Sequence, residues 1–427
     1  NTQGFENGAG FRDQSRLYHL ESDYDISRFT PNWNTIVGAS YRLYDPESNG
    51  IIFPDTVGND ITMFEYSFFA QTQRELLNDK LQTTVSARVD KNENFQPRIS
   101  PGLSVLYRLG QDQRVRFSVQ SGFRFPSLKE QFAFQNLGRA TLVGGLTGIT
   151  DQLSLPGNSF FEPTVQEFNQ VVDTESNLFA GTGTLTREQA ELANLSILTD
   201  GILGEGAIAP IKPEKVLTLE LGFRSYFLNR KIYFDINGYA NYYTDFIGVK
   251  RVFKPRTSPQ TDLFLAAGQL NRPNERDLYF INTNSTERVI TNGVAAKVDY
   301  HPSSAYTIGL NATWSKISAG GDDAFIPSFN TPEWKGNASI ARKFKKNIQA
   351  KATIRMRNDF QWQSNFGDGV VERFAILDIQ VTKDIPSIHS HIKIGVSNAL
   401  NSYYTDVFGG PQIGALPFIQ LMYNPKK

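Results

Sequence analysis

The chain has 427 residues, a formal net charge of zero at pH 7 and no cysteine. The lack of cysteine excludes disulfide bonds and thiolate metal sites, and the balanced charge argues against a nucleic-acid-binding protein with a basic surface. The sequence has no run of about 18 apolar residues, so it contains no candidate transmembrane helix.

Apolar and polar side chains alternate along most of the chain, and this period of two predicts antiparallel strands with one apolar face. Leu217, Leu219 and Leu221, for example, are separated by polar or charged residues. In chain order, the alternation predicts strands at 15–27, 33–45, 62–76, 80–90, 99–109, 114–125, 215–228, 231–246, 291–301, 306–318, 334–344, 347–360, 373–384, 390–400 and 415–424.

Many of these strands exceed the roughly 5–6 residues usual in soluble sheets, and about 9–11 tilted residues are enough to cross a membrane. Tight turns alternate with long loops, as they do in outer-membrane barrels. The predicted fold class is therefore all-β, a transmembrane antiparallel β-barrel with short periplasmic turns and long extracellular loops. The longest connection, 127–213, is predicted to be a large extracellular loop that contains a helix at 186–195. Other long loops are predicted at 46–60, 253–289, 319–332, 361–372 and 401–414.

Charged residues are concentrated on one of the two alternating sets of positions along the predicted strands, which we call one parity. Because a Lys or Arg on the lipid face at mid-membrane costs about 2–4 kcal/mol, this parity is predicted to face inward. The inward charges, ten basic and five acidic, are Arg42, Glu65, Arg88, Arg108, Arg116, Arg124, Glu220, Arg224, Asp235, Lys297, Asp299, Lys351, Arg355, Arg357 and Asp378.

Five segments, in order, resemble the strands and loops of TonB-dependent outer-membrane receptors. They are "VRFSVQSGFRFPSLKEQF" (115–132), "IKPEKVLTLELGFRSYFLNRKIYFDINGYANYYTDFI" (211–247), "NTPEWKGNASI" (330–340), "KIGVSNALNSYYTD" (393–406) and "GGPQIGALPFIQLMY" (409–423). The upstream segments 32–60 and 86–101 are most similar to the large receptors of the Bacteroidetes group. The resemblance implies that residues 1–427 are the C-terminal part of a receptor barrel.

This family has a barrel of about 22 strands with a plugged lumen, of which the chain would supply about 15. The remaining strands, the plug domain and the TonB-contact motif are expected upstream, since the first residues show neither a plug nor a signal peptide. The resemblance implies a receptor in the outer membrane of a Gram-negative cell that binds substrate at its extracellular loops. Import would then be driven by the TonB complex, which contacts the missing N-terminal region.

Two other functions remain open: a barrel subunit of a larger outer-membrane assembly with a structural or surface-binding role, and a passive porin. The expected surroundings are outer-membrane lipid, and a surface lipoprotein or other outer-membrane subunit is a candidate partner. No nucleic-acid partner, cofactor or enzymatic activity is predicted, because no nucleophile–base arrangement is present. Siderophores, vitamin B12, glycans and peptides are all compatible substrates, and the Bacteroidetes resemblance favours glycans or peptides.

The candidate contacts to substrate or plug are inward charges near the large loop and aromatic rings within it. They are Arg116, Arg124, Arg224, Glu220, Asp235, Phe160, Phe161 and Phe168. Alternatively, the charges contact water in the lumen, and the rings form the core of the loop itself. No metal site is predicted, because His389 and His391 have no third ligand nearby.

Overall fold

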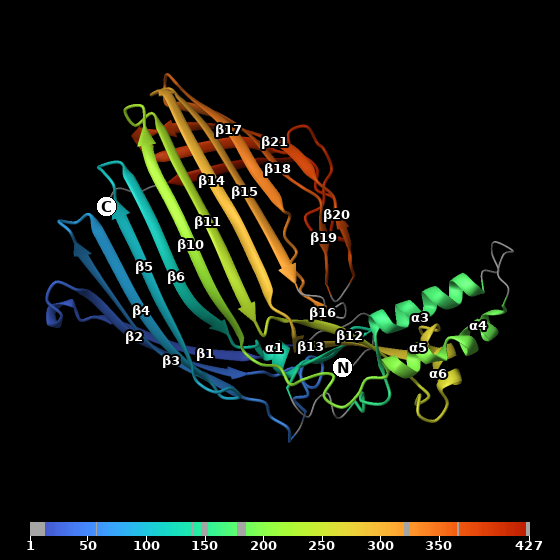
Figure 1. Ribbon diagram of the computed structural model, residues 1–427. Coiled ribbons are helices and arrows are strands. Elements are labelled where there is room, and N and C mark those ends of the chain that lie inside the picture. Colours follow the sequence, from blue (N-terminus) through green and yellow to red (C-terminus); the bar gives the residue numbers. More distant parts are fainter. Residues whose placement is uncertain are drawn as a thin grey trace.

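The computed structural model describes residues 13–56, 58–138, 140–146, 153–176, 185–319, 325–364 and 367–423. Fifteen strands form one antiparallel meander that curls into a deep trough, with both ends of the sheet bending behind β10 and β11 (Figure 1). These strands are β1 (Arg16–Asp25), β2 (Asn34–Asp45), β3 (Met63–Leu76), β4 (Leu81–Asn92), β5 (Arg98–Arg108), β6 (Gln113–Arg124), β10 (Glu214–Phe227), β11 (Ile232–Thr244), β14 (Val289–Ser303), β15 (Tyr306–Ala319), β17 (Trp334–Phe344), β18 (Ile348–Arg357), β21 (Phe374–Ile385), β22 (Ser390–Ser397) and β23 (Leu416–Tyr423).

Every predicted strand is confirmed, in the predicted order. The boundaries differ most for β18, which ends at Arg357 rather than 360, and for β22, which ends at Ser397 rather than 400. Within the described residues the sheet is open, with β1 and β23 as its two edges. The structure therefore confirms the all-β antiparallel architecture, although these fifteen strands do not close on themselves.

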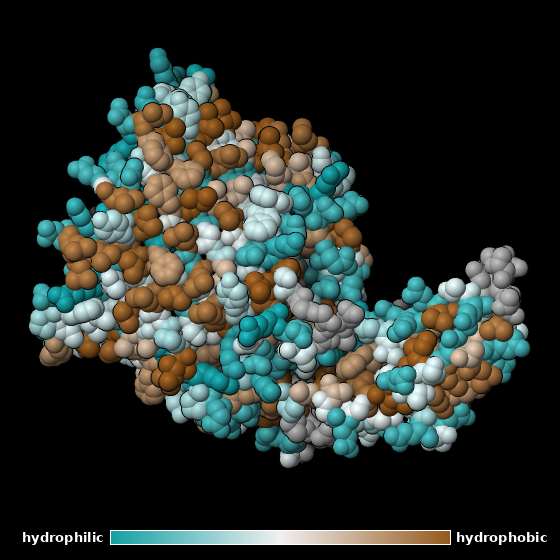
Figure 2. All heavy atoms as spheres, viewed as in Figure 1, coloured by the Kyte–Doolittle hydropathy of each residue, from teal (hydrophilic) through white to brown (hydrophobic). Residues whose placement is uncertain are grey.

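The convex face of the sheet carries the apolar side chains of the alternating pattern. Leu221 is 60% exposed, Ile340 49% and Val381 44%, although all three are large and apolar. Figure 2 shows such hydrophobic residues spread over the face of the sheet that is toward the viewer. An exposed apolar surface of this extent is expected of a sheet that faces lipid rather than water.

Tight turns join the strands at one end of the sheet. The turns at 77–80 and 228–231 read LNDK and LNRK, and the first three residues of each have φ between 51° and 63°. Each turn is closed by a backbone hydrogen bond from its Lys to its Leu carbonyl, 3.3 Å long at Lys80 and 3.2 Å at Lys231. Asn tolerates this left-handed conformation better than most residues, which explains its place in both turns.

The long loops at the opposite end fold together into a unit that we call the loop subdomain. It comprises a second sheet, in the order β16-β12-β13-β8-β7 with β9 beside β12, and the helices α3 to α6. The helices project away from the trough (Figure 1). Its strands and helices are β7 (Phe134–Asn136), β8 (Thr141–Val143), β9 (Phe160–Phe161), α3 (Glu162–Glu175), α4 (Arg187–Ala193), α5 (Leu195–Gly201), β12 (Ile247–Pro255), α6 (Leu263–Leu270), β13 (Arg276–Asn284) and β16 (Phe325–Ile326).

Short elements complete the described chain. They are the 3₁₀ helices η2 (Ser27–Phe29) and η3 (Pro386–Ile388), the helix α1 (Leu128–Phe132), and the strands β19 (Phe360–Trp362) and β20 (Gly369–Val371). No helix among the described residues is long and apolar enough to cross a membrane.

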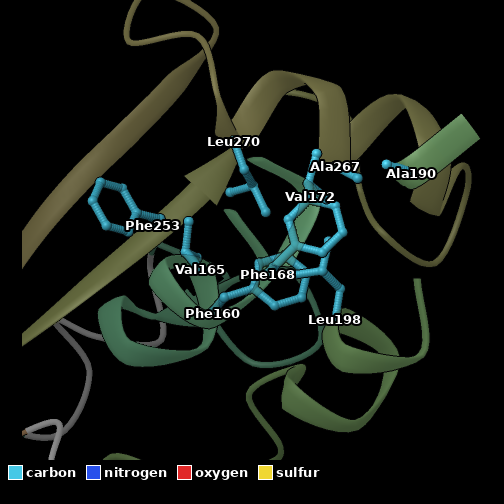
Figure 3. Close-up of a cluster of buried hydrophobic side chains, with 9 residues drawn as sticks. All are labelled: Phe160, Val165, Phe168, Val172, Ala190, Leu198, Phe253, Ala267 and Leu270. Carbon is cyan, nitrogen blue, oxygen red and sulfur yellow. The ribbon is translucent and has the colours of Figure 1, made fainter. Parts of the chain in front are cut away.

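The loop subdomain has its own hydrophobic core. Helix α3 buries Val165, Phe168 and Val172, which lie on one face at helical spacing. Phe168 lies among side chains from the other helices and from β12 (Figure 3). The full cluster is Phe160, Val165, Phe168, Val172, Ala190, Leu198, Phe253, Ala267 and Leu270.

The helix predicted at 186–195 is confirmed as α4, which has a capping box formed by Thr186 and Gln189. The long connection predicted at 253–289 does lie between two strands of the large sheet, β11 and β14, but it also contains regular structure that was not predicted: part of β12, all of α6 and all of β13. Local sequence could not distinguish a loop from elements whose apolar faces are covered only by segments distant in the chain.

Candidate functional site

A strip of polar side chains lines the concave face of β6, β10 and β11. Arg116 on β6 forms an ion pair with Glu220 on β10, with 3.5 Å between Nη2 and Oε2. Ser118 Oγ donates to the same Glu220 oxygen over 3.2 Å, and Arg116 Nη2 donates to Asn237 Oδ1 over 3.4 Å. The structure thus brings two of the predicted site residues, Arg116 and Glu220, into contact.

The strip continues toward the tight turns through Asp235. Asn237 Nδ2 donates to Asp235 Oδ1 over 2.8 Å, and Tyr233 Oη donates to Asp235 Oδ2 over 2.7 Å. Arg224 is the register partner of Asp235 across the β10–β11 pair, so the two side chains share the concave face. Side-chain contacts therefore connect three predicted site residues, Arg116, Glu220 and Asp235, in one polar strip, and Arg224 lies beside them on the same face.

Lys297 and Asp299 are among the predicted inward charges, although neither is among the predicted site residues. Their side chains are 2.8 Å apart on β14, and the Lys297 ammonium lies 5.5 Å from the centre of the Tyr233 ring. The strip therefore extends across β6, β10, β11 and β14. Its order depends on strand register, which the alternation of side chains does not encode.

Arg124 lies apart from this strip, at the rim near the loop subdomain. Its guanidinium is 2.7 Å from Glu130 Oε2 and 3.7 Å from Glu214 Oε2. Glu130 also closes the capping box of α1 with Ser127, so Arg124 connects the end of β6 to the first turn of this helix. Arg124 is thus part of the rim, where strands pass into loops.

A pocket of about 450 Å³ lies beside this rim, on the concave face of β2 to β6. Two pairs organise its polar wall: Arg88 Nε is 2.8 Å from Asp90 Oδ1, and Tyr44 Oη donates to Glu65 Oε2 over 3.1 Å. Arg124 contributes to the same wall. A pocket with paired charges of both signs suits a polar ligand that is bound by hydrogen bonds rather than by net charge.

The turn at 48–55 lies in the loop between β2 and β3 and is organised by Asp55. Its carboxylate accepts hydrogen bonds from the Asn49 and Gly50 amides, each 3.1 Å long, and from both the amide and the hydroxyl of Ser48. Burial by itself would raise the pKa of Asp55, but the hydrogen bonds from Ser48 and Gly50 outweigh it and hold the pKa below its ordinary value.

The three predicted aromatic residues lie in the loop subdomain. Phe160 and Phe168 have no exposed surface and belong to its main core (Figure 3). Phe161 is half-buried and packs against a second cluster, which contains Val252 and Ile281. Phe160 and Phe168 would reach a ligand only if this core opened.

A pocket of about 680 Å³ lies on the helical side of the loop subdomain. Arg187 on α4 contacts Asp173 on α3 at 2.7 Å and Glu191 at 3.2 Å, and Phe264 and Leu265 on α6 add apolar surface. The sequence does not predict this pocket, because its walls come from three helices of two separate loops.

Arg251 on β12 joins the loop subdomain to the loop at 361–372. Its guanidinium is 3.2 Å from Glu162 Oε2 on α3, and it also pairs with Asp368. It lies over the Phe280 ring as well, 5.2 Å from the ring centre. With its side chain only 14% exposed, Arg251 is a buried connection between three separate chain segments.

Within the described residues, no group of three or more His, Asp or Glu side chains is arranged to hold a metal ion. His391 Nδ1 lies 2.6 Å from Asp384 Oδ1, near the tight turns. His389 is in the left-handed conformation at the end of η3, with φ of 49°.

Comparison with family models identifies one family for most of the chain. The family model described as TonB dependent receptor-like, beta-barrel, matches residues 1–401. A search of curated protein sequences gave no match. Among solved structures, a mutant of the ferric enterobactin receptor PfeA from Pseudomonas aeruginosa aligns with a TM-score of 0.59 and 12% identity, over 97% of this chain and 54% of that chain.

Two further solved structures show the same fold. The siderophore receptor PirA from Acinetobacter baumannii aligns with a TM-score of 0.58 and 12% identity, over 96% of this chain and 55% of its own. The FrpB iron transporter from Neisseria meningitidis gives 0.58 and 11%, over 96% and 55%. The chain thus spans about half the length of the structures it matches. The family match over most of the chain, together with the open sheet of long amphipathic strands, shows that this protein belongs to the TonB-dependent receptor β-barrel family of the outer membrane.

Proposed function

We propose that this protein is an outer-membrane receptor that binds a substrate at its extracellular end and imports it by TonB-dependent transport. The observation that supports this proposal is the division of the sheet into three regions. Its convex face is apolar, its concave face carries a connected polar strip, and its long loops form a folded unit at one end. The tight turns at the other end face the periplasm, where the TonB complex is the proposed partner.

The proposed route for the substrate begins at the loop subdomain, which is the large extracellular insertion of 127–213 joined by 247–284. It continues through the rim pocket beside Arg124 to the strip that contains Arg116 and Glu220. Because most charges along this route are paired, we infer a polar substrate recognised by hydrogen bonds. Metal complexes are the first class to test, since the similar structures include a ferric enterobactin receptor and an iron transporter.

The experiment measures uptake by cells that express the full-length protein, with and without a protonophore. Radiolabelled ferric siderophores, glycans and peptides are supplied separately. Uptake of one class that stops with the protonophore is expected. Uptake that continues unchanged after the proton gradient is removed would instead identify a passive pore and overturn the proposal.

Variants of the rim test the site. Arg124 is 45% exposed, so Arg124→Ala should cost less than about 1 kcal/mol of stability and leave insertion normal. A loss of uptake in this variant would therefore report a contact with substrate or plug. Arg108→Ala is the matched control, because Arg108 also pairs with an acid, Glu75 at 3.2 Å, but lies at the turn end of its strand. Equal effects of the two variants would count against the assigned site.

A surface-binding role within a larger assembly is a second candidate, favoured by the loop subdomain having its own core. Under this hypothesis, a surface lipoprotein or another subunit would contact the pocket between α3, α4 and α6. Isolation of the native complex distinguishes the two roles. A subunit that is released by Arg187→Ala, without loss of the receptor itself, would support the assembly role.

A further inference from the structure

Arg342 is a cation on the lipid-facing side of the sheet, close to the tight turns. It is the register partner of Tyr306, and the next outward pair on the same two strands is Ile308 with Ile340. These isoleucines are 41% and 49% exposed and belong to the apolar convex face. Because residues two apart on a strand point to the same face, Arg342 lies on the face of Ile340 and Tyr306 on that of Ile308, so both project toward lipid.

Two aromatic rings hold the guanidinium of Arg342. Its central carbon lies 5.1 Å from the centre of the Tyr306 ring and 4.8 Å from that of Phe344. Among the described residues, no carboxylate forms an ion pair with Arg342, and its side chain is exposed. The charge is therefore oriented by stacking but not neutralised by the protein.

The other charges near Arg342 are also basic. Lys383 on β21 lies two residues after Val381 and therefore points to the same convex face. Its ammonium donates to the backbone carbonyl of Lys346 in the turn after β17. Lys345 adjoins it in the same turn. The nearest acid on β21, Asp384, is the next residue along the strand, so it points to the concave face, where it contacts His391. This surface, comprising Arg342, Tyr306, Phe344 and Lys383, is here called the basic–aromatic patch.

A second arginine is stacked on an aromatic ring on the same face, toward the other edge of the sheet. Arg74, near the turn end of β3, lies 5.3 Å from the centre of the Trp33 ring. Arg74 is an even number of residues from Phe68 on the same strand, so it points to the same convex face, where Phe68 is 59% exposed. Arg74 likewise forms no ion pair among the described residues. The arrangement therefore recurs at the same level of the sheet, near the periplasmic surface of the membrane.

We propose that the basic–aromatic patch binds the phosphate group of an anionic phospholipid in the periplasmic leaflet. An arginine on the lipid face is unfavourable in hydrocarbon but is stabilised at the interface, where lipid phosphates lie. A planar guanidinium matches phosphate through two parallel hydrogen bonds, and stacking on Tyr306 and Phe344 fixes its orientation in advance. This inference rests on the outer-membrane location and does not depend on the proposed transport.

The test uses the full-length protein in detergent micelles, titrated with phosphatidylglycerol and observed by native mass spectrometry. Arg342→Gln should weaken phosphatidylglycerol binding by about 5- to 10-fold, the loss expected for one charge-assisted contact. Diacylglycerol with the same acyl chains, which lacks the phosphate, should bind equally to wild type and variant. Arg342→Lys should give an intermediate affinity, because it keeps the charge and loses the planar fork.

Lys343→Gln is the matched control, because Lys343 is the adjacent residue and projects to the opposite face of β17. It should leave phosphatidylglycerol binding unchanged. Equal weakening by Lys343→Gln and Arg342→Gln would overturn the proposal, as would equal binding of phosphatidylglycerol and diacylglycerol to wild type. If Arg342→Gln does not insert, Tyr306→Leu keeps the apolar face and should weaken phosphatidylglycerol binding; an unchanged affinity would refute the site.

Discussion

The core of the loop subdomain allows a quantitative test through Phe168→Ala. The ring has no exposed surface and is enclosed by residues of α3, α4, α5, α6 and β12. Truncation of a fully buried Phe costs about 3–5 kcal/mol, because apolar contact is lost and a cavity remains. Local opening of the subdomain should therefore become about two to nearly four orders of magnitude more frequent.

Hydrogen exchange of the full-length protein in detergent micelles measures this opening. Amides of α3 and α5 should lose protection in Phe168→Ala, whereas amides of β10 and β11 should keep theirs, since those strands lie outside this core. Leu192→Ala on α4 is the control: Leu192 is 52% exposed, so the expected change is within about 0.5 kcal/mol. Equal effects of the two substitutions would refute the packing described for Phe168.

Three further predictions concern separate parts of the molecule. Leu221→Arg, at mid-strand on the convex face, should cost about 2–4 kcal/mol of stability in the membrane, measured by reversible unfolding in vesicles. Thr218→Arg, on the concave face of the same strand, should be tolerated. A larger loss of stability in Thr218→Arg than in Leu221→Arg would show that the two faces are assigned the wrong way round. Arg251→Met leaves two carboxylates without their shared partner, so protection from hydrogen exchange in β19 and β20 should fall by about 3 kcal/mol; unchanged protection would contradict the connection. Because the pKa of Asp55 is lowered, its carboxylate stabilises the 48–55 turn above the unfolded-state pKa of about 3.9, and this stabilisation is lost as the pH falls through the lower folded-state pKa. Opening of the turn, corrected for intrinsic exchange, should rise in that acidic range in wild type but not in Asp55→Asn, and a matching rise in the variant would assign the effect to another group.

The strands and their orientation were predictable from the sequence because both are encoded locally. A period of two is visible within a few residues, and charges such as Arg116 and Glu220 identify the concave face without knowledge of the neighbouring strands. The tight turns follow from short motifs, as in the LNDK and LNRK segments. The resemblance of five ordered segments to one receptor family is confirmed by the family match over residues 1–401.

Only the tertiary structure determined which charged groups meet and how the loops fold. Arg116 contacts Glu220 because the register of β6 and β10 places Arg116 opposite Gly222, diagonal to Glu220 on the same face, although the whole loop of 127–213 separates their strands in the chain. Arg251 and Asp368 are still further apart in sequence. Likewise, β12, α6 and β13 bury their apolar faces against segments from other loops, so no local pattern within 253–289 distinguishes them from an exposed connection. Local periodicity specifies the strand and its faces, whereas ion pairs and shared cores depend on the energy of packing between distant segments.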